Sequence, residues 1–355
     1  MLNVAVVGVG RLGSIHTKLI REFGTFNLVG VVDPVESNRH VAAEEFGTTA
    51  FADVDSIIDQ IDAAIVATPT VYHHGVSKQL LENGKHVFVE KPITPTLEEA
   101  DELISVANAN DCVLQVGHVE RFNPAFLAST AHLNNVRWME CTRTSGYTFR
   151  STDVSVVLDL MIHDIDLMLN VIQSDIRDIN AFGYSVVGPH ADIAHAHISF
   201  VNGAQAKLAA SRCADNAERS LLAVSEHKQT TIDFTTASAN VQYTSEEMLG
   251  LNIDPMGVTA EEKDEISGRF FTDLVPRQEL AVPPGNAIVS EHKDFAVAIS
   301  NGQHVQVPGA AGRDALAVAL EIQQRLHAVR HDAPHTGVPS PNSTALISLR
   351  QLKAA

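Results

Sequence analysis

Apolar and polar positions follow different patterns in the two halves of this chain. In the first 119 residues, short continuous apolar runs alternate with stretches that have helical spacing. Continuous apolar runs predict buried parallel strands, because such strands are covered on both faces. The strands are expected at 2–7, 28–32, 63–67, 86–89 and 113–116, and the later helices at 37–46, 76–82 and 97–108. This repetition predicts an α/β domain with a doubly wound parallel sheet over 1–119.

From residue 120 onward, apolar residues alternate with polar ones in short segments. These segments lie at 178–187, 193–201, 205–212, 220–225 and 229–234. Asn202-Gly203, between two of them, is a hairpin turn signal. We therefore expect an α+β domain with a large, mostly antiparallel sheet over 120–330. Helices are expected at 287–299 and 311–329, able to pack back on the first domain, and 245–285 is expected to be irregular.

One stretch, Val154–Ile172, is apolar on nearly every helical face except a narrow line. Ser155, Asp159, His163 and Asp166 follow one another along it at spacings of four, four and three. On a helix these spacings place them on one face. A helix that is apolar on most sides is buried, and its polar residues must be paired or line a cavity. The stripe is typical of acid–base chemistry, although a half-exposed helix with a solvated stripe would give the same pattern.

The first expected strand runs directly into Gly8-Val9-Gly10-Arg11-Leu12-Gly13 and then into a helix. Gly8 permits a tight turn, Gly10 lets the backbone approach a pyrophosphate, and Gly13 lets the helix pack close to the strand. Asp33 ends the second strand, where a carboxylate accepts hydrogen bonds from ribose hydroxyls and repels a 2′-phosphate. The pattern predicts a Rossmann-type site for NAD, with NADP less favoured. A glycine turn without a ligand is the alternative.

Further polar residues follow the carboxyl ends of the later strands, where ligands bind in such sheets. The expected cofactor site comprises Gly8, Gly10, Arg11, Leu12, Gly13, Asp33, Thr68, Pro69, His73, Glu90, Lys91 and His118. Lys91 stands between a buried strand and a proline, which restricts its backbone. A lysine held there can stabilise a developing alkoxide, whereas a surface lysine at a strand end is the alternative.

The composition of the chain argues against several classes of protein. The chain has 355 residues, 45% of them hydrophobic, which is ample for two domains and a polar tail at 331–355. Its net charge of −18 argues against nucleic acid or anionic membranes as partners. Its three cysteines and seventeen histidines show no metal-ligand spacing, so we expect no metal and a reducing compartment. Without a recognisable signal peptide or membrane span, a cytoplasmic location is expected.

Several motifs together resemble the Gfo/Idh/MocA family of NAD(P)-dependent oxidoreductases. They are GVGRLG (8–13), Asp33, ATPT (67–70), GKHVFVEKP (84–92), the DxxxH of 159–163 and EHKDFAVAISNG (291–302). The resemblance covers roughly 1–330 and implies that Lys91, Asp159 and His163 form the catalytic group. His163 would then act as general base, Asp159 would orient it or bind a neighbouring hydroxyl, and Lys91 would stabilise the reacting oxygen.

A finer resemblance is carried by GHVERFNPA (117–125) and VVLDLMIHDIDLML (156–169). Both are similar to the branch of the family that acts on nucleotide sugars, especially UDP-N-acetylglucosamine 3-dehydrogenases. The resemblance implies oxidation of a secondary hydroxyl of a UDP-sugar to a 3-keto sugar. It also implies a homodimer or homotetramer, for which the exposed face of the second sheet is the expected surface.

An anionic UDP-sugar requires local cations on an acidic protein. The expected substrate contacts are Arg121, Asn123, Arg143 and Arg150. Solvated surface charge is the alternative for the arginines. Two other functions also stay open, namely a dehydrogenase of free sugars or polyols such as glucose or inositol, and a non-catalytic NAD-binding regulator.

Overall fold

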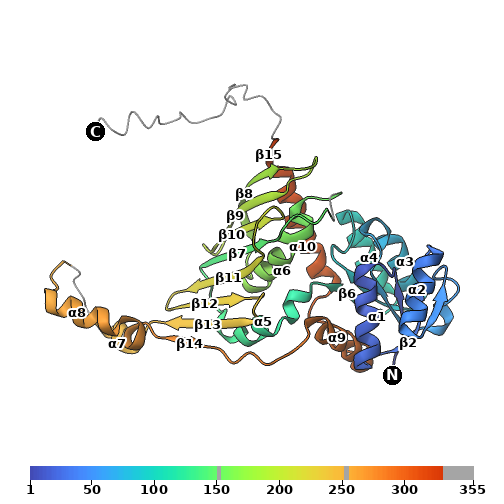
Figure 1. Cartoon of the computed structure of the whole chain (residues 1–355), viewed down its shortest axis with the longest axis horizontal. Coiled ribbons are helices and arrows are strands. Elements are labelled where there is room, and N and C mark those ends of the chain that lie inside the picture. The colour runs from blue at the N-terminus through green and yellow to red at the C-terminus, as the bar shows by residue number, and fades with distance from the viewer. Residues whose placement is uncertain (150–152, 252–255, 331–355) are drawn as a thin grey trace.

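The computed structural model describes residues 1–149, 153–251 and 256–330 of the chain, so Arg150 and the polar tail lie outside the described residues. Figure 1 shows two sheets that lie beside each other, each with its own helices. The smaller sheet holds the N-terminus, and the larger one is formed by the second half of the chain. The expected α/β domain followed by an α+β domain is confirmed.

The smaller sheet is six-stranded and parallel, in the order β3-β2-β1-β4-β5-β6. Its strands are β1 (Asn3–Val7), β2 (Asn27–Val32), β3 (Thr49–Phe51), β4 (Ala63–Val66), β5 (His86–Glu90) and β6 (Leu114–Gly117). Its helices are α1 (Arg11–Phe23), α2 (Glu36–Phe46), α3 (His73–Glu82) and α4 (Leu97–Ala109). Ala5 and Val7 belong to one buried cluster, and Val4 and Val6 to another, which is why the strand is apolar throughout. The strand order reverses between β1 and β4, and this opens a crevice at their carboxyl ends.

The larger sheet has nine strands in the order β14-β13-β12-β11-β7-β10-β9-β8-β15. Its strands are β7 (Trp138–Thr144), β8 (Ile176–Ser185), β9 (Ile193–Phe200), β10 (Gln205–Ser211), β11 (Glu218–Ser225), β12 (Lys228–Asp233), β13 (Ser238–Tyr243), β14 (Arg277–Glu279) and β15 (His327–Arg330). It is antiparallel except where β7 pairs with β10 and β8 with β15. Strand β7 is absent from the sequence-based prediction, because Arg143 occupies an inward-facing position and breaks the apolar alternation that Met139 and Cys141 begin.

Besides a π-helical turn over Phe270–Leu274 and strand β14, the described part of the segment 245–285, which is expected to be irregular, contains two α-helices. They are α7 (Glu246–Gly250) and α8 (Ala260–Arg269). Helix α8 begins with a capping box, in which Thr259 Oγ1 accepts from the Glu262 backbone N–H and the Glu262 carboxylate accepts from the Thr259 N–H. The acidic residues of this segment therefore start a helix, and Figure 1 shows both helices extending beyond the sheet.

The last two helices pack back on the first half of the chain. They are α9 (Ala287–Asn301) and α10 (Gly309–Arg325). Phe295 of α9 belongs to a buried cluster of the smaller sheet. In α10, Leu316 is buried with the smaller sheet and Ala319 with the larger one. Helix α10 therefore joins the two cores, and it ends earlier than expected because the chain enters β15.

The helix expected at 154–172 consists of two parts. A π-helical turn over Val157–Met161 is followed by the α-helix α6 (Ile162–Val171). A π-helical turn holds more residues than an α-helical one, so the spacing from Ser155 to Asp159 differs from the regular stripe that the sequence predicts. Such turns are frequent at functional sites.

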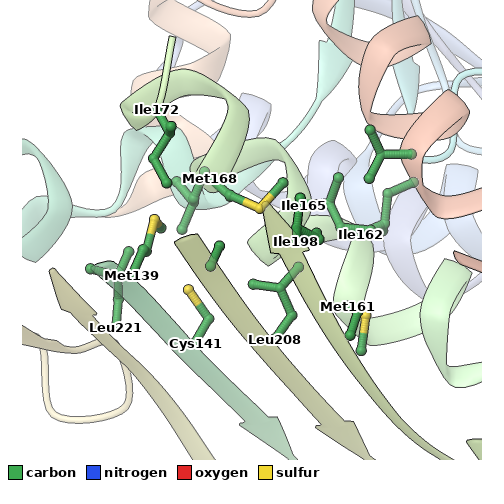
Figure 2. Packing of buried hydrophobic residues seen from close by; sticks show 14 of the residues in the cluster. Met139, Cys141, Met161, Ile162, Ile165, Met168, Ile172, Ile198, Leu208 and Leu221 are labelled. Carbon is green, nitrogen blue, oxygen red and sulfur yellow. The ribbon is translucent and has the colours of Figure 1, made fainter. Parts of the chain in front are cut away.

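The apolar side of α6 packs on the larger sheet, as Figure 2 shows. Ile165 and Met168 belong to one buried cluster with Met139, Cys141 and Leu208 of β7 and β10. This packing holds the N-terminal end of α6 beside the carboxyl end of the smaller sheet. Although α6 is strongly apolar, no helix of the described residues is long and apolar enough to cross a membrane.

Candidate active site

A cavity of about 1040 Å³ lies at the carboxyl ends of β1, β2 and β4. Of the expected cofactor residues, it is lined by Gly8, Gly10, Arg11, Leu12, Asp33, Thr68 and Pro69. Side chains that the sequence did not suggest also line it, among them Asn38, Asp53, Tyr72 and Gln79. The cavity reaches Asp159 of the π-helical turn. One continuous space therefore connects the glycine turn with Asp159, whereas Lys91 and His163 do not line it.

The glycine turn at the end of β1 is too crowded for a side chain at Gly8 and Gly13, but it is open at Gly10. Gly8 has a φ of +87°, and a Cβ there would lie 2.8 Å from the Ala67 carbonyl oxygen. A Cβ on Gly13 would lie 1.8 Å from the carbonyl oxygen of Gly8, so α1 packs directly on the turn. A Cβ on Gly10 would meet nothing within 4 Å. The open backbone at the start of α1 fits a pyrophosphate, which binds free N–H groups at a helix N-terminus.

Asp33 connects the turn with the loop after β2. Its carboxylate accepts hydrogen bonds from the backbone N–H of Val9 at 3.1 Å and of Val35 at 2.9 Å. Two further lone-pair positions remain on this carboxylate for ribose hydroxyls. The nearest cation, Arg39, donates to the carbonyl oxygen of Pro34 at 3.1 Å. The loop therefore presents an acid at the place where the ribose of a dinucleotide is expected.

His73 does not line the cavity. Its ring nitrogens lie 2.9 Å from the carbonyl oxygens of Pro92 and Thr68. Burial lowers the pKa of His73, against the effect of these two carbonyls. The histidine therefore connects the loops after β4 and β5, which positions Thr68 on one side and Lys91 on the other.

Lys91, Asp159 and His163 come together where the two sheets meet. Lys91 Nζ donates to the backbone carbonyl of Asp159 at 2.6 Å and lies 3.9 Å from its carboxylate. His163 follows one helical turn later, and the centroid of its ring lies 6.4 Å from that of His118. The structure therefore assembles the three expected catalytic residues from two distant parts of the chain.

Burial changes the protonation of this group. It lowers the pKa of Lys91, although the charges of Asp159 and Glu90 oppose the shift. Burial, together with the positive charges of Lys91 and Arg143, holds the pKa of His163 well below its ordinary value. Nδ1 of His163 has no hydrogen-bond partner among the described residues. A neutral, unpartnered imidazole beside an ammonium group can accept a proton from a hydroxyl.

Beneath Lys91 lies a buried chain of hydrogen bonds. His16 Nε2 lies 2.8 Å from the carboxylate of Glu90, and its Nδ1 lies 2.7 Å from Nε2 of His292. Although burial alone would raise it, the pKa of Glu90 is lowered by the hydrogen bond from His16 and the charge of Lys91. Glu90 also accepts a hydrogen bond from the Lys91 backbone N–H at 3.2 Å. Glu90 is therefore a support for Lys91 rather than a residue that lines the cofactor cavity.

His118 follows β6 and is only 1% exposed. Neither of its ring nitrogens has a hydrogen-bond partner among the described residues, and burial lowers its pKa. Buried polar groups without partners are uncommon in folded proteins and are characteristic of sites that bind a ligand or water. Its position beside His163 places it at the catalytic group, and it does not line the cofactor cavity.

Two of the expected substrate arginines form internal ion pairs. Arg121 donates to both carboxylate oxygens of Asp166 at 2.7 Å. Arg143, which is 3% exposed, donates to Asp164 at 2.8 Å and to Glu120 at 2.7 Å. Although burial alone would lower it, these carboxylates raise the pKa of Arg143. Both guanidinium groups are engaged within the chain, which does not favour their expected role as diphosphate contacts.

Asn123, another of the expected substrate residues, also forms its hydrogen bonds within the chain. Asn123 begins α5 (Pro124–Ser129), where its side-chain oxygen accepts from the Ala125 backbone N–H at 3.0 Å. Its amide group donates to Glu120 at 3.1 Å. Its role toward a substrate stays a prediction, as does that of Arg150. Among the described residues, no three His, Cys, Asp or Glu side chains are grouped so that they could hold a metal ion.

Comparison with known proteins agrees with this geometry. Residues 2–118 match the model of an oxidoreductase family with an NAD-binding Rossmann fold, and residues 127–239 match the GFO/IDH/MocA C-terminal domain. The chain is 31% identical over 328 residues to the UDP-N-acetylglucosamine 3-dehydrogenase of Acidithiobacillus ferrooxidans, covering 92% of this chain and 98% of that relative. This chain belongs to the Gfo/Idh/MocA family. The resemblance expected from the motifs is confirmed.

Solved structures and other members of the Gfo/Idh/MocA family also match this chain, some over a shorter stretch or at lower sequence identity. A solved structure of the Acidithiobacillus ferrooxidans enzyme superposes with a TM-score of 0.80 at 29% identity, covering 92% of this chain and 97% of that one. The scyllo-inositol 2-dehydrogenase (NAD(+)) of Bacillus subtilis is 30% identical over 230 residues, which is 59% of this chain and 67% of the relative. A levoglucosan dehydrogenase in complex with NADH shares the fold, with a TM-score of 0.76 at 19% identity over 91% of this chain and 96% of that one. The chain is accordingly an NAD(P)-dependent oxidoreductase that acts on a CH–OH group.

Sequence reasoning missed the residues that support the catalytic group of this Gfo/Idh/MocA protein. His292 lies in α9 between Val289 and Phe295, three residues from each, and all three side chains are buried. His16 likewise lies on the buried face of α1. A histidine at an apolar helical position was the signal that could have revealed both. Its partner could not be named, because the partner comes from another part of the chain.

Proposed function

We propose that this protein oxidises the 3-hydroxyl of UDP-N-acetylglucosamine to a 3-keto sugar with NAD. The observation that carries the proposal is that the cavity beginning at the glycine turn reaches Asp159, whose carbonyl holds Lys91 and which lies one turn before His163. A base and a cation beside a dinucleotide site are the groups that oxidation of an alcohol requires. The similarity to a UDP-N-acetylglucosamine 3-dehydrogenase supports the choice of substrate.

His163 is the general base. Because its pKa lies well below the ordinary value, the ring is neutral at pH 7 and ready to take the hydroxyl proton. Asp159 lies one turn earlier on the same element, where it positions Lys91 and the neighbouring substrate hydroxyls. A positioned base of this kind contributes about 10²–10⁴-fold to the rate.

Lys91 stabilises the oxygen from which the proton is removed. Its ammonium group is held by the Asp159 carbonyl, and its backbone is held by Glu90. In this partly buried setting, its charge acts on the developing alkoxide with little screening by water. The Glu90–His16–His292 chain keeps the strand end and therefore the lysine in place.

The residues around the cavity fit NAD. The turn at Gly8, Gly10 and Gly13 has the close packing and open backbone that a pyrophosphate needs. When bound, NAD supplies the hydride acceptor. We propose NAD rather than NADP because the carboxylate of Asp33 would repel a 2′-phosphate, while Arg39 is engaged with the carbonyl of Pro34.

Oxidation of a free polyol is the second candidate. The similarity to a scyllo-inositol 2-dehydrogenase favours it, and so does the internal pairing of Arg121 and Arg143, because a neutral polyol needs no free cation. The same catalytic group would serve both substrates.

The experiment is NADH formation, followed by absorbance, with UDP-N-acetylglucosamine, N-acetylglucosamine, glucose and inositols as separate substrates. Parallel reactions contain 2-oxoglutarate as a hydride acceptor, in case the reduced cofactor is held tightly. Because the acceptor consumes NADH, these reactions are followed by the formation of 2-hydroxyglutarate and of the keto sugar. Turnover confined to the UDP-sugar supports the proposal, whereas turnover with free polyols supports the second candidate. His163→Asn should abolish most turnover, and His227→Asn, an exposed histidine in the turn between β11 and β12, should leave it unchanged. Absence of turnover with every substrate by a protein that binds NAD would favour the regulator.

We also propose a homodimer or homotetramer formed through the larger sheet. Phe182 lies opposite His195 on the face away from the buried cluster, and it is 50% exposed. Large exposed apolar side chains are characteristic of interaction surfaces. Light scattering after gel filtration, with Phe182→Glu as the disrupting variant, tests this. A cytoplasmic location stays a prediction.

A further inference from the structure

The larger sheet places two arginines side by side at the end nearest the catalytic group. In the register of β7 with β11, Arg143 lies directly opposite Arg219. Side chains alternate along a strand, so Arg143 shares its face with Cys141, and Arg219 shares its face with Leu221. Figure 2 shows Cys141 and Leu221 on the side of the sheet that is covered by α6. Both arginines therefore stand on the side of the sheet that carries the catalytic helix.

The two arginines differ in their partners. The guanidinium of Arg143 is buried between two carboxylates, one of which is Asp164. Arg219 is exposed, and its side chain has no carboxylate partner among the described residues. The adjacent acid, Glu218, accepts a hydrogen bond from Ser220 Oγ at 2.7 Å, on the opposite face of the strand. The charge of Arg219 is therefore available to a ligand.

Arg219 also lies within electrostatic reach of the base. Burial is the main cause of the low pKa of His163, and the positive charge of Arg219 lowers it further. Burial raises the pKa of Asp164, the residue next to His163, and the positive charge of Arg219 is among the charges that oppose this rise. The geometry agrees with this, because Arg219 lies opposite Arg143, and Arg143 is hydrogen-bonded to Asp164, the neighbour of His163. A ligand on Arg219 would therefore lie near the catalytic histidine.

The other cations near the catalytic group are already balanced. Lys91 has Asp159 beside it, and Arg121 is paired with Asp166. Arg143 itself lies between Glu120 and Asp164, so Arg219 is the arginine of this pair that lacks a carboxylate partner among the described residues.

We propose that Arg219 binds the diphosphate of the nucleotide-sugar substrate while the sugar hydroxyl reaches His163. This inference rests on the proposed function and deepens it. In UDP-N-acetylglucosamine the diphosphate is attached to the anomeric carbon, which a single ring carbon separates from the reacting C3. A cation for the diphosphate must therefore lie close to the base, as Arg219 does. A guanidinium is suited to this role because it donates two parallel hydrogen bonds to phosphate oxygens.

The test compares wild type with Arg219→Gln, Arg219→Lys and the control Arg137→Gln. Arg137 directly precedes β7 at the end away from Arg143, is exposed, and donates to the carbonyl of Asn202. We expect Arg219→Gln to raise the KM for UDP-N-acetylglucosamine and the inhibition constant of UDP about 10- to 100-fold. The kcat and the affinity for NADH should change little, Arg219→Lys should restore part of the binding, and Arg137→Gln should behave as wild type.

Two results would overturn the inference. The first is an inhibition constant for UDP that is the same in wild type and Arg219→Gln. The second is a shift of the acid limb of kcat/KM to higher pH without any loss of UDP binding, which would mean that Arg219 acts on His163 alone. Failure of the proposed function has a different signature, because wild type itself would then not turn over the UDP-sugar. Calorimetric titration of UDP into wild type and Arg219→Gln would still decide whether Arg219 binds the diphosphate.

Discussion

Replacing Arg143 with Met tests whether this arginine stabilises the fold or contacts the substrate. The side chain of Arg143 is 4% exposed, and it donates to Asp164 and Glu120, whose side chains are 2% and 9% exposed. Met keeps much of the volume but leaves both carboxylates without their cation. Breaking a buried ion pair in this way costs about 3–5 kcal/mol. At about 2–4 °C for each kcal/mol, the melting temperature should fall by about 6–20 °C.

The loss should also depend on pH. In the folded protein burial raises the pKa of Asp164, and Arg143 opposes that shift. Without Arg143 the pKa of Asp164 rises further, so the folded state binds a proton that the unfolded state has released. Stability of the variant therefore falls as pH increases through the folded pKa of Asp164, and the deficit relative to wild type should be larger at pH 8 than at pH 5.

Thermal unfolding followed by circular dichroism at both pH values measures this, with Arg137→Met as the matched control. The control removes an exposed arginine near the start of the same strand and should change the melting temperature by only a degree or two. If Arg143→Met melted like wild type while its affinity for a UDP-sugar collapsed, the reasoning would be refuted. Arg143 would then be a substrate residue, as the sequence alone suggested.

The remaining predictions concern the base, the pH profile and the glycine turn. His163→Asn should lower kcat by about 10²–10⁴-fold and leave NADH binding, measured by fluorescence, unchanged; loss of NADH binding would instead mark His163 as structural. In wild type, kcat/KM should rise with pH as His163 loses its proton, and this acid limb should lie well below pH 6.5. It should fall again at a pH below the usual range of lysine, as Lys91 loses its proton. An acid limb at or above pH 6.5 would contradict the burial of His163. In Gly13→Ala the first domain should not fold, because the new Cβ would lie 1.8 Å from the Gly8 oxygen. Gly10→Ala should fold normally but bind NADH more weakly. Thermal unfolding and NADH titration would measure these two effects.

Most of the first domain could be predicted from the sequence because its signals are local. Continuous apolar runs mark strands covered on both faces, and the glycine spacing marks a turn that other side chains cannot enter. Strands β8 to β12 of the second domain were also readable from alternation, but β13 was not expected. Strand β7 was not expected either, since the inward-facing Arg143 interrupts its pattern, and its position between β10 and β11 could not be predicted. Helices α7 and α8 were missed because their polar sequence carries no apolar face.

The sequence by itself determined which groups are available for chemistry. Lys91 follows a strand of the first sheet, and Asp159 and His163 are one turn apart on an apolar element, so local spacing was enough to single them out. Only the tertiary structure decided how charges are paired. Arg143 meets Asp164 and Glu120, and His16 meets His292 across 276 residues of chain. Local patterns show that a side chain is charged or buried, but its partner depends on which elements pack together, because the free energy of a buried charge is set by the groups that surround it in space.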